Sequence, residues 1–151
     1  SQARVADDPP SMLRELNATL TRNVRRGFVT ATYLFFDGMR VEIANAGHPA
    51  PLLLRGGEVR ELGAVNPLLG RFKSASYSAT TTDLQPGDRI VAYTDGIPEA
   101  LNARGEAFGE ERLYALLRQR GDIIDAVLAW RGGRGDADDL TLVTIDVDSA
   151  R

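Results

Sequence analysis

The sequence contains no cysteine and a single histidine, His48, and both shortages restrict the chemistry of any site. Without cysteine, the chain forms no disulfide and offers no thiolate to a metal. One histidine excludes a multi-histidine zinc site within a single chain. A metal bound here must therefore be held mainly by oxygen atoms, which favours Mg²⁺, Mn²⁺ or Ca²⁺.

Long apolar runs and basic clusters are also scarce, and this limits the expected partners. No apolar run approaches the roughly 18 residues that span a bilayer, and no signal-peptide pattern is present, so we expect no membrane association. The formal net charge is −3, and without a long basic cluster we expect no nucleic acid partner. The length of 151 residues, with 43% hydrophobic and 26% charged residues, fits one globular domain.

The first half of the chain reads as one helix followed by strands. Residues 1–10 are polar and end in two prolines, so we predict a flexible lead-in to a single domain over 11–148. A helix is predicted over 12–25, because Ser11 is a good N-cap and leucines recur at helical spacing. Residues 28–94 predict strands, because aromatic and β-branched runs are separated by turn pairs such as Asp-Gly and Gly-Gly.

The second half returns to helices before a last strand. Residues 97–102 are compatible with a short helix, with a proline tolerated in its first turn. The runs at 110–120 and 122–130 predict two amphipathic helices, the second capped by Asp122. Residues 140–147 predict the closing strand. About seven strands and three helices in this order predict the α+β class with a largely antiparallel sheet.

The stretch RIVAYTDGIPEA, residues 89–100, ends an apolar strand abruptly in Asp95-Gly96. Two interpretations stay open. An Asp-Gly pair after a strand is usually a turn. Alternatively, the strand end fixes the Asp95 carboxylate at the sheet edge, while Gly96 lets the backbone turn beside it and leaves room for an ion and its waters.

A second acidic pair, Asp138-Asp139, directly precedes the closing strand. Adjacent carboxylates repel each other, so they need solvent or a cation. A solvated loop satisfies that need, but acids at two strand boundaries can also meet and form a hard-cation site with Asp95. His48, in the turn NAGHPAP, is either structural or an acid that protonates a leaving group.

Four stretches occur in an order that resembles a known family: FVTATY, NAGHPAPLLL, LQPGDRIVAYTDGIPEALNARGEAFGEERL and DDLTLVTIDV. They resemble the type 2C, or PPM, metal-dependent serine/threonine phosphatases. Within that family they are most similar to the bacterial branch typified by the sporulation stage II protein E phosphatase. The resemblance covers residues 11–147, nearly the whole chain.

The resemblance implies a β-sandwich flanked by helices in αββα layers, with a pair of Mn²⁺ or Mg²⁺ ions held by aspartates. Asp95 matches the acid of the family's TDG motif, and Asp138, with Asp139 beside it, matches its final acidic motif. His48 matches a turn that borders the metals. The implied activity is hydrolysis of phosphoserine or phosphothreonine by a metal-activated water. The implied substrate is a phosphorylated regulator, such as an anti-sigma-factor antagonist, in cytoplasmic bacterial signalling.

The family's upstream motif, resembling D-x-S-G-H-G, is absent from this sequence, and its Asp normally bridges the two ions. We therefore expect the N-terminal part of the domain to be missing. This departure leaves an alternative open, in which the chain is a catalytically impaired or inactive interaction module of the same fold. Uncovered strand edges invite pairing with another copy, so a homodimer is also expected.

Overall fold

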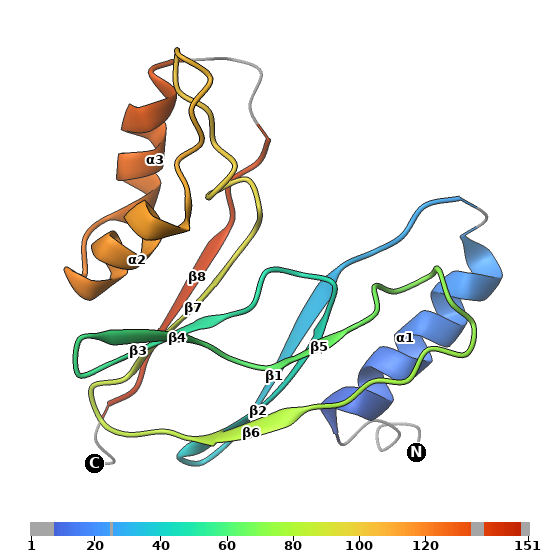
Figure 1. The fold of residues 1–151 in the computed structure, drawn as a ribbon. Coiled ribbons are helices and arrows are strands. Elements are labelled where there is room, and N and C mark those ends of the chain that lie inside the picture. Colours follow the sequence, from blue (N-terminus) through green and yellow to red (C-terminus); the bar gives the residue numbers. More distant parts are fainter. Residues whose placement is uncertain (1–7, 25, 134–137, 149–151) are drawn as a thin grey trace. The chain divides into compact units, whose positions relative to one another are not determined.

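The structure of the chain, a computed structural model, describes residues 8–24, 26–133 and 138–148 (Figure 1). It divides into two compact units built from alternating stretches of the chain. Unit 1 comprises Ser1–Ala50 and Leu62–Gln85, and unit 2 comprises Pro51–Glu61 and Pro86–Arg151.

Three helices and eight strands make up the described residues: α1 (Pro9–Asn23), β1 (Ala31–Asp37), β2 (Arg40–Ala46), β3 (Leu52–Arg55), β4 (Glu58–Glu61), β5 (Ala64–Asn66), β6 (Thr80–Asp83), β7 (Arg89–Tyr93), α2 (Glu110–Arg118), α3 (Ile123–Arg131) and β8 (Leu142–Asp146). Among these helices, none combines the length and the apolar character that a membrane span requires.

Helix α1 begins at Pro9, three residues before the predicted start. Its N-cap is Asp8 rather than Ser11, because the Asp8 carboxylate accepts hydrogen bonds from the Ser11 backbone nitrogen at 2.9 Å and from the Ser11 hydroxyl at 2.8 Å. The backbone bond is the main cause that lowers the pKa of Asp8. Pro9 and Pro10 fit the first turn, where backbone N–H groups have no helical partner. They are therefore helical rather than part of a lead-in, whose residues 1–7 lie outside the described ranges.

The sheet of unit 1 is organised around β2. Strand β1 pairs antiparallel along one edge of β2, and the other edge is shared by β6, which is antiparallel, and β5, which is parallel. Asp37 faces Arg40 in the register, so the hairpin turn is Gly38-Met39 rather than the predicted Asp37-Gly38. On this sheet α1 packs through a core of four fully or almost fully buried residues: Leu13, Ala44, Ala46 and Leu69.

The sheet of unit 2 has the order β4-β3-β7-β8 and is antiparallel throughout. The turn between β3 and β4 is the predicted Gly56-Gly57 pair. Helices α2 and α3 pack on one face of the sheet, and they were predicted at nearly these positions. Their core contains Leu52, Leu54, Val91, Tyr93, Phe108, Leu113, Leu117, Ile123 and Val127, among others.

Residues 97–102 are not helical, which contradicts the short helix compatible with the sequence. The Phe108 nitrogen donates to the Ala100 oxygen at 2.8 Å, and an isolated bridge joins Leu101 to Ala107. A helix over 97–102 would use the Pro98 carbonyl to accept from Asn102, but this carbonyl accepts from the Gly109 nitrogen at 2.9 Å instead. A compact loop that precedes α2 forms instead.

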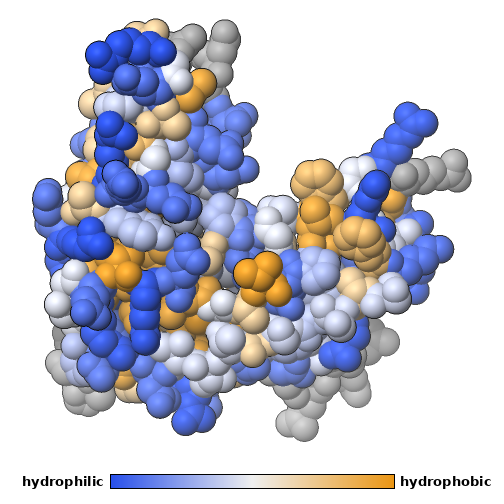
Figure 2. Space-filling view, viewed as in Figure 1, coloured by the Kyte–Doolittle hydropathy of each residue, from blue (hydrophilic) through white to orange (hydrophobic). Residues whose placement is uncertain are grey.

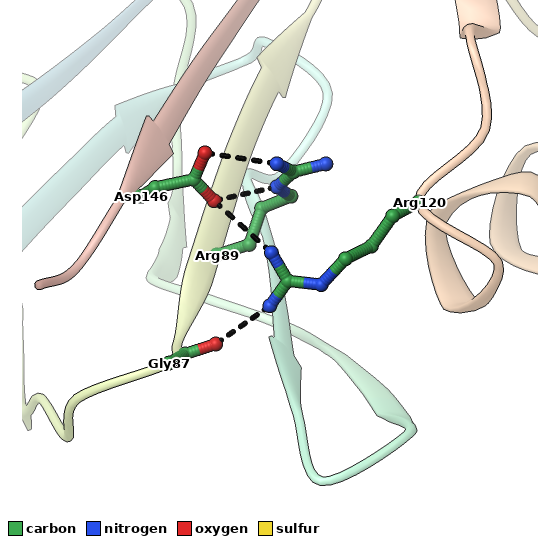
Figure 3. A network of polar contacts seen from close by, with 4 residues as sticks. All are labelled: Gly87, Arg89, Arg120 and Asp146. Atoms are coloured by element: carbon green, nitrogen blue, oxygen red, sulfur yellow. Dashed lines mark hydrogen bonds and ion pairs between the residues drawn. The ribbon is translucent and has the colours of Figure 1, made fainter.

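An ionic network joins the end of β8 to the connection between α2 and α3 (Figure 3). Arg89 binds both carboxylate oxygens of Asp146, at 2.7 and 2.8 Å. Arg120 donates to the same carboxylate at 3.4 Å and to the Gly87 carbonyl at 2.8 Å. Arg120 adopts a left-handed φ of 52°. The hydrogen bond from Arg89 is the main cause that lowers the pKa of Asp146.

The two sheets and their helices confirm the predicted α+β class with largely antiparallel pairing. One parallel pair, β2 with β5, departs from the predicted pattern. The prediction that 11–148 form a single domain stays a prediction.

Candidate functional site

The acids predicted from the sequence lie at one end of the strands of the unit 2 sheet, where β7 ends and β8 begins. Asp95 follows the end of β7, and Asp138 and Asp139 precede the start of β8. Because β7 and β8 pair antiparallel, the end of one strand lies beside the start of the other. All three acidic residues are exposed. The structure thus brings the two acidic segments to the same sheet edge.

Thr94 extends the pairing of β7 and β8 up to the residue before Asp95. Its backbone nitrogen donates to the Thr141 carbonyl at 3.1 Å, and its hydroxyl accepts from the Thr141 nitrogen, also at 3.1 Å. A threonine hydroxyl therefore replaces a backbone acceptor where the regular ladder stops. The sequence pattern had assigned no role to Thr94, although it lies within the quoted strand-end motif.

Gly96 allows the two acidic segments to approach closely. A Cβ atom on this residue would lie 2.6 Å from the Asp139 carbonyl oxygen and 3.6 Å from the Asp138 Cβ. The first distance is too short for any side chain, and the obstacle is backbone. Glycine is required here because of this close approach, in addition to the tight turn that the sequence predicted.

Arg131, in the last turn of α3, contacts both acidic segments through their main-chain carbonyl groups. Its Nη2 donates to the Asp138 carbonyl at 2.8 Å and to the Gly96 carbonyl at 3.3 Å. Its Nε is buried and has no hydrogen-bond partner in the described ranges. No sequence pattern indicates this residue, because a basic residue in the last helical turn is common and its acceptors are main-chain atoms.

His48 lies in unit 1, in the turn between β2 and β3. Its ring Nδ1 is 3.0 Å from the Thr30 hydroxyl. Its backbone nitrogen donates to the Asn45 side-chain oxygen at 3.0 Å, and its carbonyl accepts from the Asn45 amide at 2.6 Å. The turn is therefore held at three points. A role of His48 as a catalytic acid stays a prediction.

The donor atoms of the acidic segments suit a hard cation. Within the described ranges there is no group of three or more His, Cys, Asp or Glu residues placed to hold a metal ion. Mg²⁺ typically needs only one or two carboxylates, because it retains several waters. Asp95 and Asp138 are exposed carboxylates on segments that approach closely at Gly96, and oxygen donors of this kind suit such an ion. The assignment of Asp95, Asp138 and Asp139 as metal ligands stays a prediction.

The comparison with family models matches residues 1–148 to Stage II sporulation protein E (SpoIIE). Protein IcfG from Synechocystis sp. is 27% identical over 110 residues, which cover 67% of this chain and 17% of IcfG. The chain thus spans less than a fifth of this curated relative.

Two solved structures share the fold. The SiaA-PP2C domain of Pseudomonas aeruginosa superposes with a TM-score of 0.82 at 21% identity, over 93% of this chain and 61% of that one. The phosphatase domain of the cell fate determinant SpoIIE from Bacillus subtilis, presoaked with Mn, gives a TM-score of 0.66 at 15% identity, over 99% of this chain and 79% of that one. The predicted PPM-like fold is confirmed. With the match over nearly its whole length, the chain belongs to the stage II sporulation protein E family of PP2C-type phosphatase domains.

Proposed function

We propose that this chain forms part of a metal-dependent protein serine/threonine phosphatase. One observation carries the proposal: Asp95-Gly96 and Asp138-Asp139 lie side by side at the β7–β8 edge, held by Arg131. Carboxylates that adjoin at a rigid sheet edge are suited to a hard cation. Membership of a phosphatase-domain family supports the reaction class.

In the proposed reaction, water attacks the phosphorus of a phosphoserine or phosphothreonine, and the side-chain oxygen leaves with a proton. Asp95 and Asp138 would hold Mn²⁺ or Mg²⁺, with Asp139 as a further oxygen donor. When bound, such an ion lowers the pKa of a water and neutralises charge on phosphoryl oxygens. His48 is the proposed source of the proton for the leaving oxygen.

The proposed substrate is a phosphorylated regulatory protein, with an anti-sigma-factor antagonist as the specific candidate, in the cytoplasm. Family membership supports this choice, since the family model is that of a sporulation protein and the SpoIIE structure is described as a cell fate determinant. A panel of phosphoserine proteins, assayed for phosphate release, tests it. Turnover that is restricted to phosphotyrosine or small esters would contradict it.

The experiment for the proposed activity measures phosphate release from a phosphoserine peptide with Mn²⁺, with Mg²⁺ and after chelation. We expect slow release that requires a divalent ion and is lost in Asp95→Asn. Glu99→Gln, an exposed acid four residues further on, is the matched control and should retain the wild-type rate. Equal rates in Asp95→Asn and wild type would contradict the proposed role of this edge.

A second candidate is a catalytically impaired interaction module of the same fold. It is favoured by the lack, within the described ranges, of three acids grouped for a metal. Such a module would bind a phosphorylated partner without turning it over. Binding of a phosphopeptide with unchanged phosphopeptide mass after incubation with Mn²⁺ would support it. Self-association is proposed as well, and light scattering at increasing protein concentration measures it.

A further inference from the structure

A basic pocket lies in unit 1, between the end of α1 and the loop that follows β5. Its cavity volume is about 280 Å³. Arg26, Arg71 and Lys73 line it together with Thr21 and two glycines, and no acidic residue does. No local sequence pattern indicates this pocket, because its cations come from segments far apart along the chain.

The two chain segments that form the pocket contain no acid at all. Residues 16–36 and 62–82 include five of the 18 Lys and Arg residues and none of the 21 Asp and Glu residues. Lys73 is the only lysine of the chain. In a protein with a formal net charge of −3, such a separation creates a local positive potential that attracts anions.

Hydrogen bonds fix the walls of the pocket. The side chain of Asn17, 2% exposed, donates to the Phe72 carbonyl at 2.9 Å and accepts from the Gly70 nitrogen at 2.9 Å. Val29 and Leu69 exchange two backbone hydrogen bonds of 3.0 and 2.8 Å. The loop with Arg71 and Lys73 is therefore held against α1 without any ligand, which reduces the ordering cost of binding.

The three cations remain available for a ligand. Arg26, Arg71 and Lys73 are exposed, and within the described ranges no ion pair includes them. The C-terminal end of α1 carries a partial charge of about −0.5, which offsets only a small part of three full positive charges. The pocket is therefore attractive to a dianion.

We propose that this pocket binds a phosphate dianion, either as inorganic phosphate or as the phosphoryl group of a phosphorylated peptide segment. Arginine offers a planar fork that matches phosphate oxygens, and lysine adds a point charge. Phe28 and Phe72, next to the pocket residues in sequence, are 62% and 54% exposed and offer apolar contacts that only a peptide could use. Figure 2 shows hydrophobic residues beside strongly hydrophilic ones on the drawn face of unit 1. The proposal does not depend on phosphatase activity.

The test titrates inorganic phosphate into the full chain in metal-free buffer at constant ionic strength. Because Lys73 is the only lysine, ¹³C labelling of lysine gives one side-chain NMR signal that reports directly on the pocket. We expect this signal to shift with phosphate and to saturate. Arg26→Gln/Arg71→Gln should weaken the affinity at least about tenfold, while Arg14→Gln/Arg60→Gln, with the same change of charge, should retain it.

A second arm compares a phosphoserine peptide with its unphosphorylated form. Tighter binding of the phosphopeptide than of inorganic phosphate, lost in the pocket variant, assigns the site to a phosphorylated segment. Equal affinities for the phosphopeptide and for inorganic phosphate assign the site to free phosphate. The proposal is overturned if the Lys73 signal does not change up to about tens of millimolar phosphate, a concentration at which even a weak site would be occupied. It is also overturned if the pocket variant and the control variant lose phosphate affinity equally.

Discussion

Arg131 donates a hydrogen bond of 2.8 Å from its Nη2 to the main-chain oxygen of Asp138. The same nitrogen lies 3.3 Å from the Gly96 oxygen. One guanidinium therefore sets the spacing of two segments that each carry an acid, and it does so without contacting either carboxylate through these bonds. The Arg131 side chain thus positions the candidate site through main-chain contacts.

Replacement of Arg131 by Met should separate the two acidic segments. We expect a loss of about 1.5–3 kcal/mol in the free energy of unfolding, because two carbonyls lose a charged donor. Mn²⁺ affinity should fall about tenfold, as it does when residues that orient metal ligands are removed. Arg118→Met, in the last turn of α2, is the matched control. Denaturant unfolding and calorimetric Mn²⁺ titration measure both quantities, and an unchanged affinity would remove the positioning role.

Asp95→Asn should weaken Mn²⁺ binding and leave the fold intact. Asparagine keeps the size and one oxygen but lacks the charge that a hard cation needs. Repulsion between neighbouring acids is also relieved, so the metal-free protein should be as stable as wild type or more so. Calorimetric titration and thermal unfolding check both points. An unchanged Mn²⁺ affinity would support the interpretation of Asp95 as a turn residue and not as a metal ligand.

The carboxylates of Asp95 and Asp138 should share one cation. Their segments adjoin at the β7–β8 edge, and both side chains are exposed. In a crystal structure with Mn²⁺ we expect the two carboxylates within about 8 Å, which two metal–oxygen bonds of ~2.1–2.6 Å and a water can span. A larger separation would exclude a shared ion.

Gly96→Ala should be much more harmful than Gly121→Ala. The new methyl at 96 would lie 2.6 Å from a backbone oxygen, whereas at 121 the nearest atom is a Leu116 side-chain methyl at 3.1 Å. Overpacking against backbone costs about 1–3 kcal/mol, while a flexible leucine can move aside. Neither glycine has a left-handed φ, so backbone strain is matched between them. Similar unfolding free energies for the two variants would contradict the close approach at Gly96.

The network around Asp146 should make stability fall at acidic pH. Arg89 lowers the pKa of Asp146 in the folded protein, so the carboxylate stabilises the fold above its ordinary pKa of about 3.9. This contribution is lost as the pH falls through the lower folded pKa. Asp146→Asn should flatten that part of the stability curve, and Asp148→Asn should not. Identical acid unfolding of both variants and wild type would show that the network contributes nothing.

Regular patterns allowed much of the fold to be predicted. Aromatic and β-branched runs predicted strands over 28–94, and Val41 and Ile43 of β2, both β-branched, are fully buried. Strand β5 escaped notice because three residues carry no pattern. Its Asn66 side chain instead bonds the Asn45 and Ser78 carbonyls, at 3.0 and 2.9 Å, far along the chain. Local sequence cannot reveal such partners.

The candidate site was predictable where side chains carry the chemistry. Asp95, Asp138 and Asp139 are acids at strand boundaries, and strand boundaries were readable from the apolar runs. Arg131 was not, because its acceptors are main-chain oxygens that every residue possesses. The short helix compatible with residues 97–102 did not form for a related reason, because the Pro98 carbonyl accepts from Gly109, well beyond the next helical turn.

The alternation of the chain between the two units has a consequence for protein synthesis. The β3–β4 hairpin belongs to unit 2, yet it is made before unit 1 is complete. Leu54 pairs with Arg89, 35 positions later (89 − 54). At about 5–20 residues per second, the ribosome needs roughly 2–7 s to deliver β7. During that interval β3 lacks its partner strand β7. Three side chains that are buried in the finished fold, Leu52, Leu53 and Leu54, are then not yet covered by it. The nascent hairpin therefore keeps apolar side chains uncovered until β7 is made, and a holding chaperone would shield them during that interval.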